Sequence, residues 1–275
     1  MQIMGLKKSV FFQRPDIPSL TKEGFMCIDA HCHTSHSDGK QLDLVLKQCK
    51  KKGMGIGLTD HNEIAGAVEA ARQKEVPVIP GIEINTSDGP HFLAYFYNVP
   101  ELEDFYERFI KPKKYFNIRN SVKLSLLEAI EKLGSYNCVT CLPHPYAPLW
   151  ANINRTLVSN PENRRVIEHV DAIEVISGLQ IKTANRKAHA LQILFDKAPM
   201  AGSDAHGISE IGNCITLAKA GNANDFLDEI RKKRTMAIGI ERLRQKAIHA
   251  TRMLRKNSGR IRAIIKNGLF NNEAG

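Results

Sequence analysis

The sequence has no apolar run close to the roughly 18 residues that a membrane-spanning helix needs. Residues 1–18 lack a continuous apolar core and a small-residue cleavage site, so we do not expect a secretory signal. Low-complexity tracts and internal repeats are absent, and 43% hydrophobic with 25% charged residues is an ordinary globular composition. For 275 residues, these features predict one barrel or one α/β domain.

Disulfide bonds are not expected either. Six cysteines in a chain that is well supplied with core residues indicate reduced thiols and a cytoplasmic location. Cys138 and Cys141 have the spacing of a redox motif. On a strand, however, residues three apart face opposite sides, and no helix follows to lower a thiol pKa. We therefore expect no redox function.

Acidic residues are missing from residues 242–266, which hold nine of the 39 Lys and Arg. The rest of the chain carries 30 basic and 29 acidic residues, so the net charge of +10 belongs mainly to the C-terminal tail. Within the tail, Leu243, Ala247, Ala250 and Leu254 recur at helical spacing. Two interpretations stay open: a terminal helix packed on the protein body, or a basic surface that binds nucleic acid.

Short apolar runs alternate with amphipathic stretches from residue 26 onward. This alternation predicts βα units and a parallel sheet. The predicted strands, each running into a loop or turn, cover residues 26–33, 55–61, 76–85, 91–98, 138–145, 170–178 and 199–206. The predicted helices cover residues 42–53, 63–75, 121–134, 185–197 and 224–234.

Chemically reactive side chains follow these strands in the clusters HCH, TDH, GIE, HP and DAH. In (β/α) barrels, functional groups lie at the C-terminal ends of the strands. A closed barrel brings these ends to one point, whereas an open sheet spreads them along a line. We therefore predict a distorted (β/α)7 barrel over residues 26–240, preceded by an N-terminal extension (1–25) and followed by a basic helical tail (241–275).

Nine side chains near these strand ends are candidate metal ligands. Imidazole together with carboxylate suits Zn, Mn or Fe. Residues i and i+2 of a strand point to one side, so His31 and His33 can face one ion. Nine ligands exceed the three or four that a tetrahedral zinc takes, but they suffice for two or three ions, which suit phosphoryl transfer. The nine are His31, His33, Asp38, His61, Glu83, His91, His144, Asp204 and His206.

The motifs HCHTSHSDG, LTDH, PGIEI, LPHP and AGSDAH occur in this order and resemble those of the PHP family, the polymerase and histidinol phosphatase phosphoesterases. The resemblance covers roughly Cys27 to Gly239. It implies a distorted seven-stranded barrel with a trinuclear metal centre and metal-dependent phosphoesterase activity. It also implies that the same nine residues are the ligands, with Asp38 as the acid of the SDG motif and Glu83 as the bridging glutamate.

The candidate catalytic residues are Asp60, His206 and Arg119. The resemblance allows Asp60 to hold a ligand or a water in place, whereas its residue type alone also suits the N-cap of the next helix. Arg119 is similar in position to an arginine of some nucleotide-hydrolysing PHP enzymes, and arginine can hold phosphate through two hydrogen bonds. A metal-bound water and a site histidine such as His206 both stay open as the leaving-group acid.

We predict a cytoplasmic hydrolase of phosphate monoesters or diesters, in which a metal-bound hydroxide attacks phosphorus. Nucleotides or short oligonucleotides are favoured, although only 52 residues separate His91 from His144, where nucleotide-cleaving relatives usually carry a helical insertion. Histidinol phosphate and phosphotyrosine are alternative substrates. A nucleic-acid-binding module that acts through the basic tail, with a secondary metal site, is the alternative of another class. We expect no membrane partner.

Overall fold

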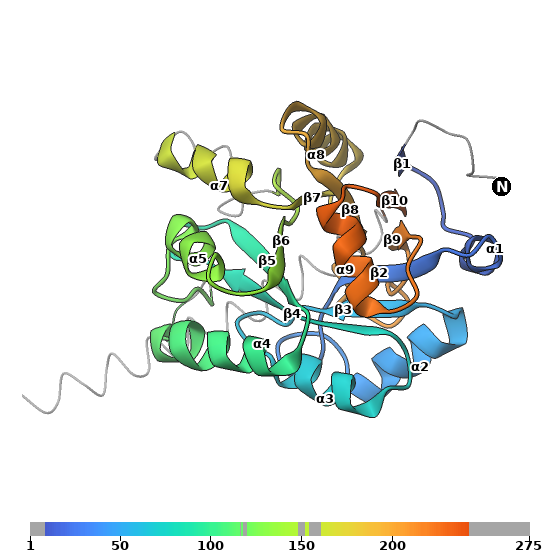
Figure 1. The fold of residues 1–275 in the computed structure, drawn as a ribbon, viewed down its shortest axis with the longest axis horizontal. Helices are drawn as coiled ribbons and strands as arrows, with labels where there is room; N and C mark the ends of the chain where they lie inside the picture. The colour runs from blue at the N-terminus through green and yellow to red at the C-terminus, as the bar shows by residue number, and fades with distance from the viewer. Residues whose placement is uncertain (1–8, 116, 118–119, 148–151, 154–160, 242–275) are drawn as a thin grey trace, which may run out of the picture.

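A computed structural model describes residues 9–241 apart from 116, 118–119, 148–151 and 154–160 (Figure 1). Ten strands form one sheet, in the order β1-β10-β9-β2-β3-β4-β5-β6-β7-β8. The strands are β1 (Val10–Phe11), β2 (Met26–Cys32), β3 (Gly55–Leu58), β4 (Val78–Asn85), β5 (His91–Phe96), β6 (Cys138–Leu142), β7 (Ala172–Ser177), β8 (Ala198–Gly202), β9 (Cys214–Ala218) and β10 (Met236–Gly239).

Helices surround the sheet, with α2, α3 and α4 along one side and α8 on the opposite side (Figure 1). The α-helices are α1 (Ile17–Lys22), α2 (Leu42–Lys52), α3 (Ala65–Gln73), α4 (Val99–Phe105), α5 (Leu126–Leu133), α7 (Arg164–His169), α8 (Lys182–Leu194) and α9 (Ala223–Arg231). Short π and 3₁₀ turns are η1 (Tyr106–Ile110), η2 (Lys111–Lys113) and η4 (Pro161–Asn163). Within the described ranges, no helix is long and apolar enough to cross a membrane.

The sheet curves into a nearly closed barrel, which confirms the predicted fold class, although it has ten strands rather than seven. Closure occurs where β8 meets β2 and β9. There the buried Thr216 hydroxyl accepts a hydrogen bond from the Ala201 N–H at 2.8 Å and donates one to the Ala201 carbonyl at 2.9 Å. A side chain thus replaces part of the missing backbone ladder at the seam.

The seven predicted strands correspond to β2–β8, but the expectation of a parallel sheet is wrong for β5. This strand runs antiparallel to β4 and to β6. Only residues 86–90 connect β4 to β5, which allows a hairpin but not the crossover of a dozen or more residues that parallel strands need. As a consequence, β5 begins at the end of the barrel where its neighbours β4 and β6 carry their polar side chains.

The barrel interior is apolar at the end where the parallel strands begin. Buried residues from the starts of these strands, such as Ile28, Val139 and Ala198, pack together. Phe226 and Ile230 of α9 belong to the same cluster. Helix α9 therefore closes this end of the barrel and leaves the opposite end for polar groups.

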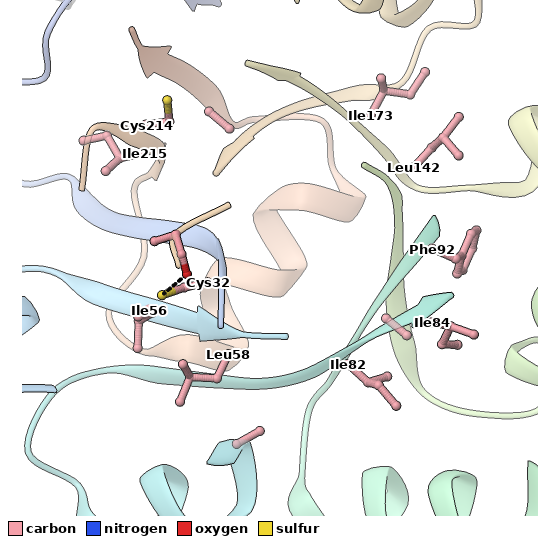
Figure 2. Packing of buried hydrophobic residues seen from close by; sticks show 14 of the residues in the cluster. Cys32, Ile56, Leu58, Ile82, Ile84, Phe92, Leu142, Ile173, Cys214 and Ile215 are labelled. Atoms are coloured by element: carbon pink, nitrogen blue, oxygen red, sulfur yellow. Dashed lines mark hydrogen bonds between the residues drawn. The ribbon is translucent and has the colours of Figure 1, made fainter. Parts of the chain in front are cut away.

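A larger apolar cluster joins the outside of the barrel to the surrounding helices. Figure 2 shows Ile56 and Leu58 of β3 with Ile82 and Ile84 of β4, all fully buried. Residues of α2 and α3 belong to the same cluster. This packing fixes the strands whose ends carry the candidate site.

The two chain ends described in the structure lie near each other in the sheet. Strand β1 pairs in parallel with β10, so residues of the predicted N-terminal extension add the last strand of the sheet. The predicted tail helix lies outside the described residues, and the division at residues 25 and 240 stays a prediction.

Candidate metal centre

The nine predicted ligands come together at one end of the barrel. They form four overlapping groups, and in each group one donor atom per residue lies within 4.8 Å of all the others. The groups are His33, Asp38, His61 and His206; His31, His33 and Glu83; His31, His144 and Asp204; and His61, Glu83 and His91. In the described part of the chain, these groups contain all nine predicted residues and no others. That they bind ions stays a prediction.

Glu83 on β4 lies at the centre of the cluster and is fully buried. Imidazole nitrogens from five histidines approach its two carboxylate oxygens. Oε2 lies 2.8 Å from His61 Nδ1 and 3.4 Å from both His31 Nε2 and His33 Nε2, and Oε1 lies 2.8 Å from His91 Nδ1 and 3.2 Å from His144 Nε2. A carboxylate in this position can bridge ions that different histidines hold.

An irregularity in β2 lies next to His31, which is on the strand, and to His33, which follows it. The register of β2 against β3 shifts between Asp29 and Cys32. Bulges of this kind re-aim side chains next to active sites. The ring centroids of His31 and His33 are 5.2 Å apart, and both rings reach Glu83. The sequence predicts that the two rings share one side but gives no sign of the bulge.

The loop after β2 turns back tightly over His33. A Cβ added to Gly39 would lie 2.0 Å from the His33 carbonyl oxygen, so only glycine fits there. This turn carries Asp38 to the cluster, where its Oδ1 lies 3.2 Å from His206 Nε2.

Asp60 holds the same loop in place. Its carboxylate accepts hydrogen bonds from the Thr34 N–H at 2.7 Å, the Thr34 hydroxyl at 2.6 Å and the Ser37 hydroxyl at 2.5 Å. The N-cap interpretation of Asp60 is wrong, because α3 begins at Ala65 and Ile64 is its N-cap. The contacts hold the loop that carries Asp38, and the role of Asp60 in holding a ligand or a water in place stays a prediction.

Asp204 and His206 follow β8 in a strained turn. Asp204 has a φ of 50°, a left-handed conformation that is costly outside glycine and recurs at functional sites. Its Oδ1 lies 3.1 Å from His33 Nε2. The buried Glu210 carboxylate accepts hydrogen bonds from the backbone N–H groups of His206 and Gly207, both at 2.7 Å, and so fixes the turn.

Burial and mutual charge shift the protonation of the cluster. Burial, reinforced by neighbouring imidazoles, lowers the pKa of His33 to about 4. Burial also opposes the charged form of His206, but Asp38 and Asp204 together outweigh it and raise that pKa to about 9. For Glu83, burial favours the neutral acid, yet His61 and the other imidazoles hold its pKa well below the usual range. Ionised carboxylates beside the neutral His33 imidazole offer oxygen and nitrogen donors to a cation, and His206 would release its proton when it binds one.

The unpaired atoms of the cluster also fit bound cations. His31 Nε2, His33 Nδ1 and His144 Nδ1 are buried and have no hydrogen bond, which is rare for buried polar atoms. Two ligands about 2.1 Å from one ion lie roughly 3.0–3.4 Å apart at octahedral or tetrahedral angles. The separations of 3.4 Å between His31 and Glu83 and 3.1 Å between His33 and Asp204 lie in this range. The donor set therefore fits divalent ions such as Zn, Mn or Fe.

Two further residues at the site were not anticipated from the sequence. Glu174 on β7 lies 3.0 Å from His31 Nδ1, and Asn85 Oδ1 lies 2.9 Å from His61 Nδ1. In the sequence, Glu174 is visible only as a single acidic residue within the apolar stretch AIEVIS. In the structure, all residues of this strand are buried. The predicted catalytic Arg119 lies outside the described residues.

The fold and the site together define a class: an α/β barrel with a cluster of His, Asp and Glu at one end. The sequence matches the PHP domain over residues 29–157 and the PHP-associated family over residues 182–235. The chain belongs to the PHP family, and the resemblance of its motifs is confirmed.

Relatives extend the match beyond the motifs. The uncharacterized protein MJ1587 of Methanocaldococcus jannaschii is 35% identical over 140 residues, which are 45% of this chain and 70% of MJ1587. A second uncharacterized protein of that organism, MJ0417, is 28% identical over 195 residues, 68% of each chain.

Solved structures with little sequence identity share the fold. The lesion-specific endonuclease PfuEndoQ from Pyrococcus furiosus has a TM-score of 0.60 and 17% identity, over 78% of this chain and 57% of the endonuclease. PsfC from Pseudomonas syringae has a TM-score of 0.58 and 15% identity, over 86% of this chain and 99% of PsfC.

Proposed function

We propose that this protein is a metal-dependent phosphoesterase that hydrolyses phosphate monoesters or diesters, with nucleotides or short oligonucleotides as the favoured substrates. The observation that carries the proposal is the buried Glu83 carboxylate with five imidazoles around it. Divalent ions bound by this cluster would lower the pKa of a water molecule and stabilise negative charge on phosphate oxygens. Two or three ions are expected, since Glu83 can bridge the groups.

The chain's own residues prepare the site for this chemistry. Histidines on β2 and β5 and those that follow β3 and β6 offer nitrogen donors from different sides of Glu83. Asp60 and Glu210 fix the two loops that carry Asp38 and His206. A donor set held by packed strands and pinned loops loses little entropy when it binds ions and substrate.

A pocket beside the cluster supports a substrate with a sizeable organic group. Its volume is about 510 Å³, and it includes His61 of the cluster. Lys114 and Tyr115 also line it. Lys114 is held by Glu63 and by the Tyr106 hydroxyl, each at 2.9 Å, and the Tyr115 ring is exposed. An exposed aromatic ring can stack on a nucleobase, which favours nucleotides over smaller esters.

Likeness to PfuEndoQ, described as a lesion-specific endonuclease, supports the diester side of the proposal. At 17% identity the likeness is one of fold, so the substrate must be found by experiment.

A hydrolysis screen tests the proposal. Purified protein is stripped with EDTA, reloaded with Mn²⁺, Zn²⁺ or Fe²⁺, and offered nucleoside monophosphates, short oligonucleotides, histidinol phosphate and a phosphotyrosine peptide. We expect metal-dependent release of product from a nucleotide or an oligonucleotide, and its loss in Asp204→Ala. A protein that binds metal but hydrolyses none of these esters or bis(p-nitrophenyl) phosphate would contradict the proposal.

The position at which the described chain ends supports a second candidate function, nucleic-acid binding. Strand β10 ends at Gly239 opposite Cys214, the first residue of β9. Because β9 is antiparallel to β2, this is the barrel end that carries the cluster. The chain therefore leaves β10 at the same end of the barrel as the site. The basic residues 242–266 follow in the sequence.

Fluorescence anisotropy with labelled single-stranded DNA tests this candidate. Binding by the full chain should weaken steeply between 50 and about 200 mM salt. Replacing Arg252, Arg255 and Lys256 with Gln should weaken it further. The matched change of Lys22, Lys47 and Lys51 on the barrel should leave binding intact. Equal binding by both variants would exclude the tail as the binding element.

A further inference from the structure

The Glu174 side chain on β7 is buried and lies between two of the predicted ligands. Its Oε1 is 3.0 Å from His31 Nδ1. Its Oε2 accepts a hydrogen bond from the backbone N–H of His144 at 2.9 Å. Both carboxylate oxygens are therefore engaged, each with a different ligand-bearing segment.

Two local features of the sheet allow Glu174 to reach His31. The register of β7 against β8 shifts between Glu174 and Ile176, as β2 shifts near His31. Between them stands Gly202 of β8. A Cβ at Gly202 would lie 2.3 Å from the His31 Cβ and 2.9 Å from Glu174 Oε1. The absence of a side chain at Gly202 is what makes room for the contact.

The contact determines which nitrogen of His31 faces the cluster. Nδ1 is the ring nitrogen that faces Glu174, and a carboxylate oxygen at 3.0 Å is placed to accept the N–H of that nitrogen. In the neutral ring, the Nε2 atom then has the lone pair that binds a metal ion. This atom lies 3.4 Å from Glu83 Oε2 and 3.7 Å from Asp204 Oδ1 and belongs to two of the four groups.

We infer that Glu174 is a positioning residue for the metal centre: it sets the tautomer and ring orientation of His31 and anchors the backbone of His144. The inference rests on the proposed function, because it assumes that the cluster binds ions. Carboxylates that receive the second N–H of a ligating histidine raise its basicity and fix its direction, and their loss typically costs about 10–100-fold in metal affinity.

The variant Glu174→Gln tests the inference by metal binding rather than by activity. Gln has the same size but only one acceptor oxygen, so it can serve His31 or His144 but not both. We expect Mn²⁺ titration by equilibrium dialysis to show one ion bound about 10–100-fold more weakly than in the wild type, with the others little changed.

Asp171→Asn is the matched control. Asp171 directly precedes β7, and its carboxylate accepts hydrogen bonds from the Thr140 N–H at 2.8 Å and hydroxyl at 2.9 Å, at the other end of the strand. This change should alter thermal stability without altering Mn²⁺ affinity. Equal Mn²⁺ affinity of Glu174→Gln and the wild type would overturn the inference. A wild-type protein that binds no Mn²⁺ would instead contradict the proposed function.

A second measurement does not depend on the folding of the variant. Long-range ¹H–¹⁵N spectra of the Zn²⁺-loaded, ¹⁵N-histidine-labelled wild type report which ring nitrogen of each histidine carries the proton. We expect His31 to be protonated at Nδ1 and metal-bound at Nε2. Zinc at Nδ1 of His31, or no zinc on its ring, would overturn the inference.

Discussion

Glu83 is a fully buried carboxylate whose near neighbours in the described structure are imidazoles rather than Lys or Arg. A buried charge is costly unless it is paired or bound to a metal. At low pH, protonated imidazoles can supply the compensating charge. Near neutral pH, neutral imidazoles can instead hold a metal ion that supplies it. Glu83 is therefore the residue on which the proposed metal centre depends most.

His33 is the histidine best prepared to act as a neutral ligand, because burial lowers its pKa to about 4. We expect His33→Ala to reduce kcat/KM at least about 100-fold, or about 2.7 kcal/mol of transition-state stabilisation. His169→Ala is the control, since His169 is exposed at the end of α7 and contacts the Arg165 carbonyl. Steady-state kinetics on the best substrate would measure both. Similar rates for a folded His33→Ala protein with its full metal content and for the wild type would remove His33 from the site.

All six cysteines are buried and free. Burial raises the pKa of Cys27 to about 11 and those of Cys49 and Cys138 to about 12. Since the pKa values in the folded state are raised, the stability that the protonated thiols contribute is present below pH 9 and is lost as pH rises toward 11. At pH 8, a thiol reagent such as DTNB should label less than one thiol per native chain and all six in guanidinium chloride. Rapid labelling of several native thiols would show that these sites are open to solvent.

At the scale of single elements, one hydroxyl contributes to the closure of the barrel, beside backbone hydrogen bonds such as that from the Asp204 N–H to the His31 carbonyl. Thr216 on β9 is fully buried and pairs with both backbone groups of Ala201 on β8. Thr216→Val keeps the shape but leaves a buried donor and a buried acceptor unsatisfied, which should cost about 2–4 kcal/mol. Thr216→Ser, which retains the hydroxyl, should cost less. Urea denaturation of the two variants measures the difference, and equal stability would show that the seam is held otherwise.

The elements also show where sequence reasoning succeeds and where it fails. Seven strands could be located because each is a short apolar run, and five of them carry one of the polar clusters HCH, TDH, GIE, HP and DAH. An apolar run looks the same for either strand direction, so the sequence did not predict that β5 is antiparallel; only the short link of residues 86–90 indicates it. His91 was placed at a strand end, whereas it is the first residue of β5. It still reaches Glu83, because an antiparallel strand begins where its neighbours end.

On the scale of the whole molecule, the motifs and their order along the chain were enough to predict that nine side chains lie close together. Histidines and carboxylates at strand ends are recognisable as candidate metal ligands from residue type alone, so their convergence could be predicted. The residues that orient them could not, because Glu174 and Asn85 become recognisable only when β7 and β4 lie against His31 and His61. The three additional strands, β1, β9 and β10, were not predicted, since they carry no ligand and β1 has only two residues.

Anomalous X-ray scattering from crystals grown with Mn²⁺ or Zn²⁺ tests the central claim most directly. The account predicts two or three anomalous peaks at the end of the barrel, within bonding distance of Glu83 and of the histidines around it, and fewer peaks in Glu83→Gln. A folded protein that shows no peak there, or peaks only at surface residues outside the four groups, would contradict the account.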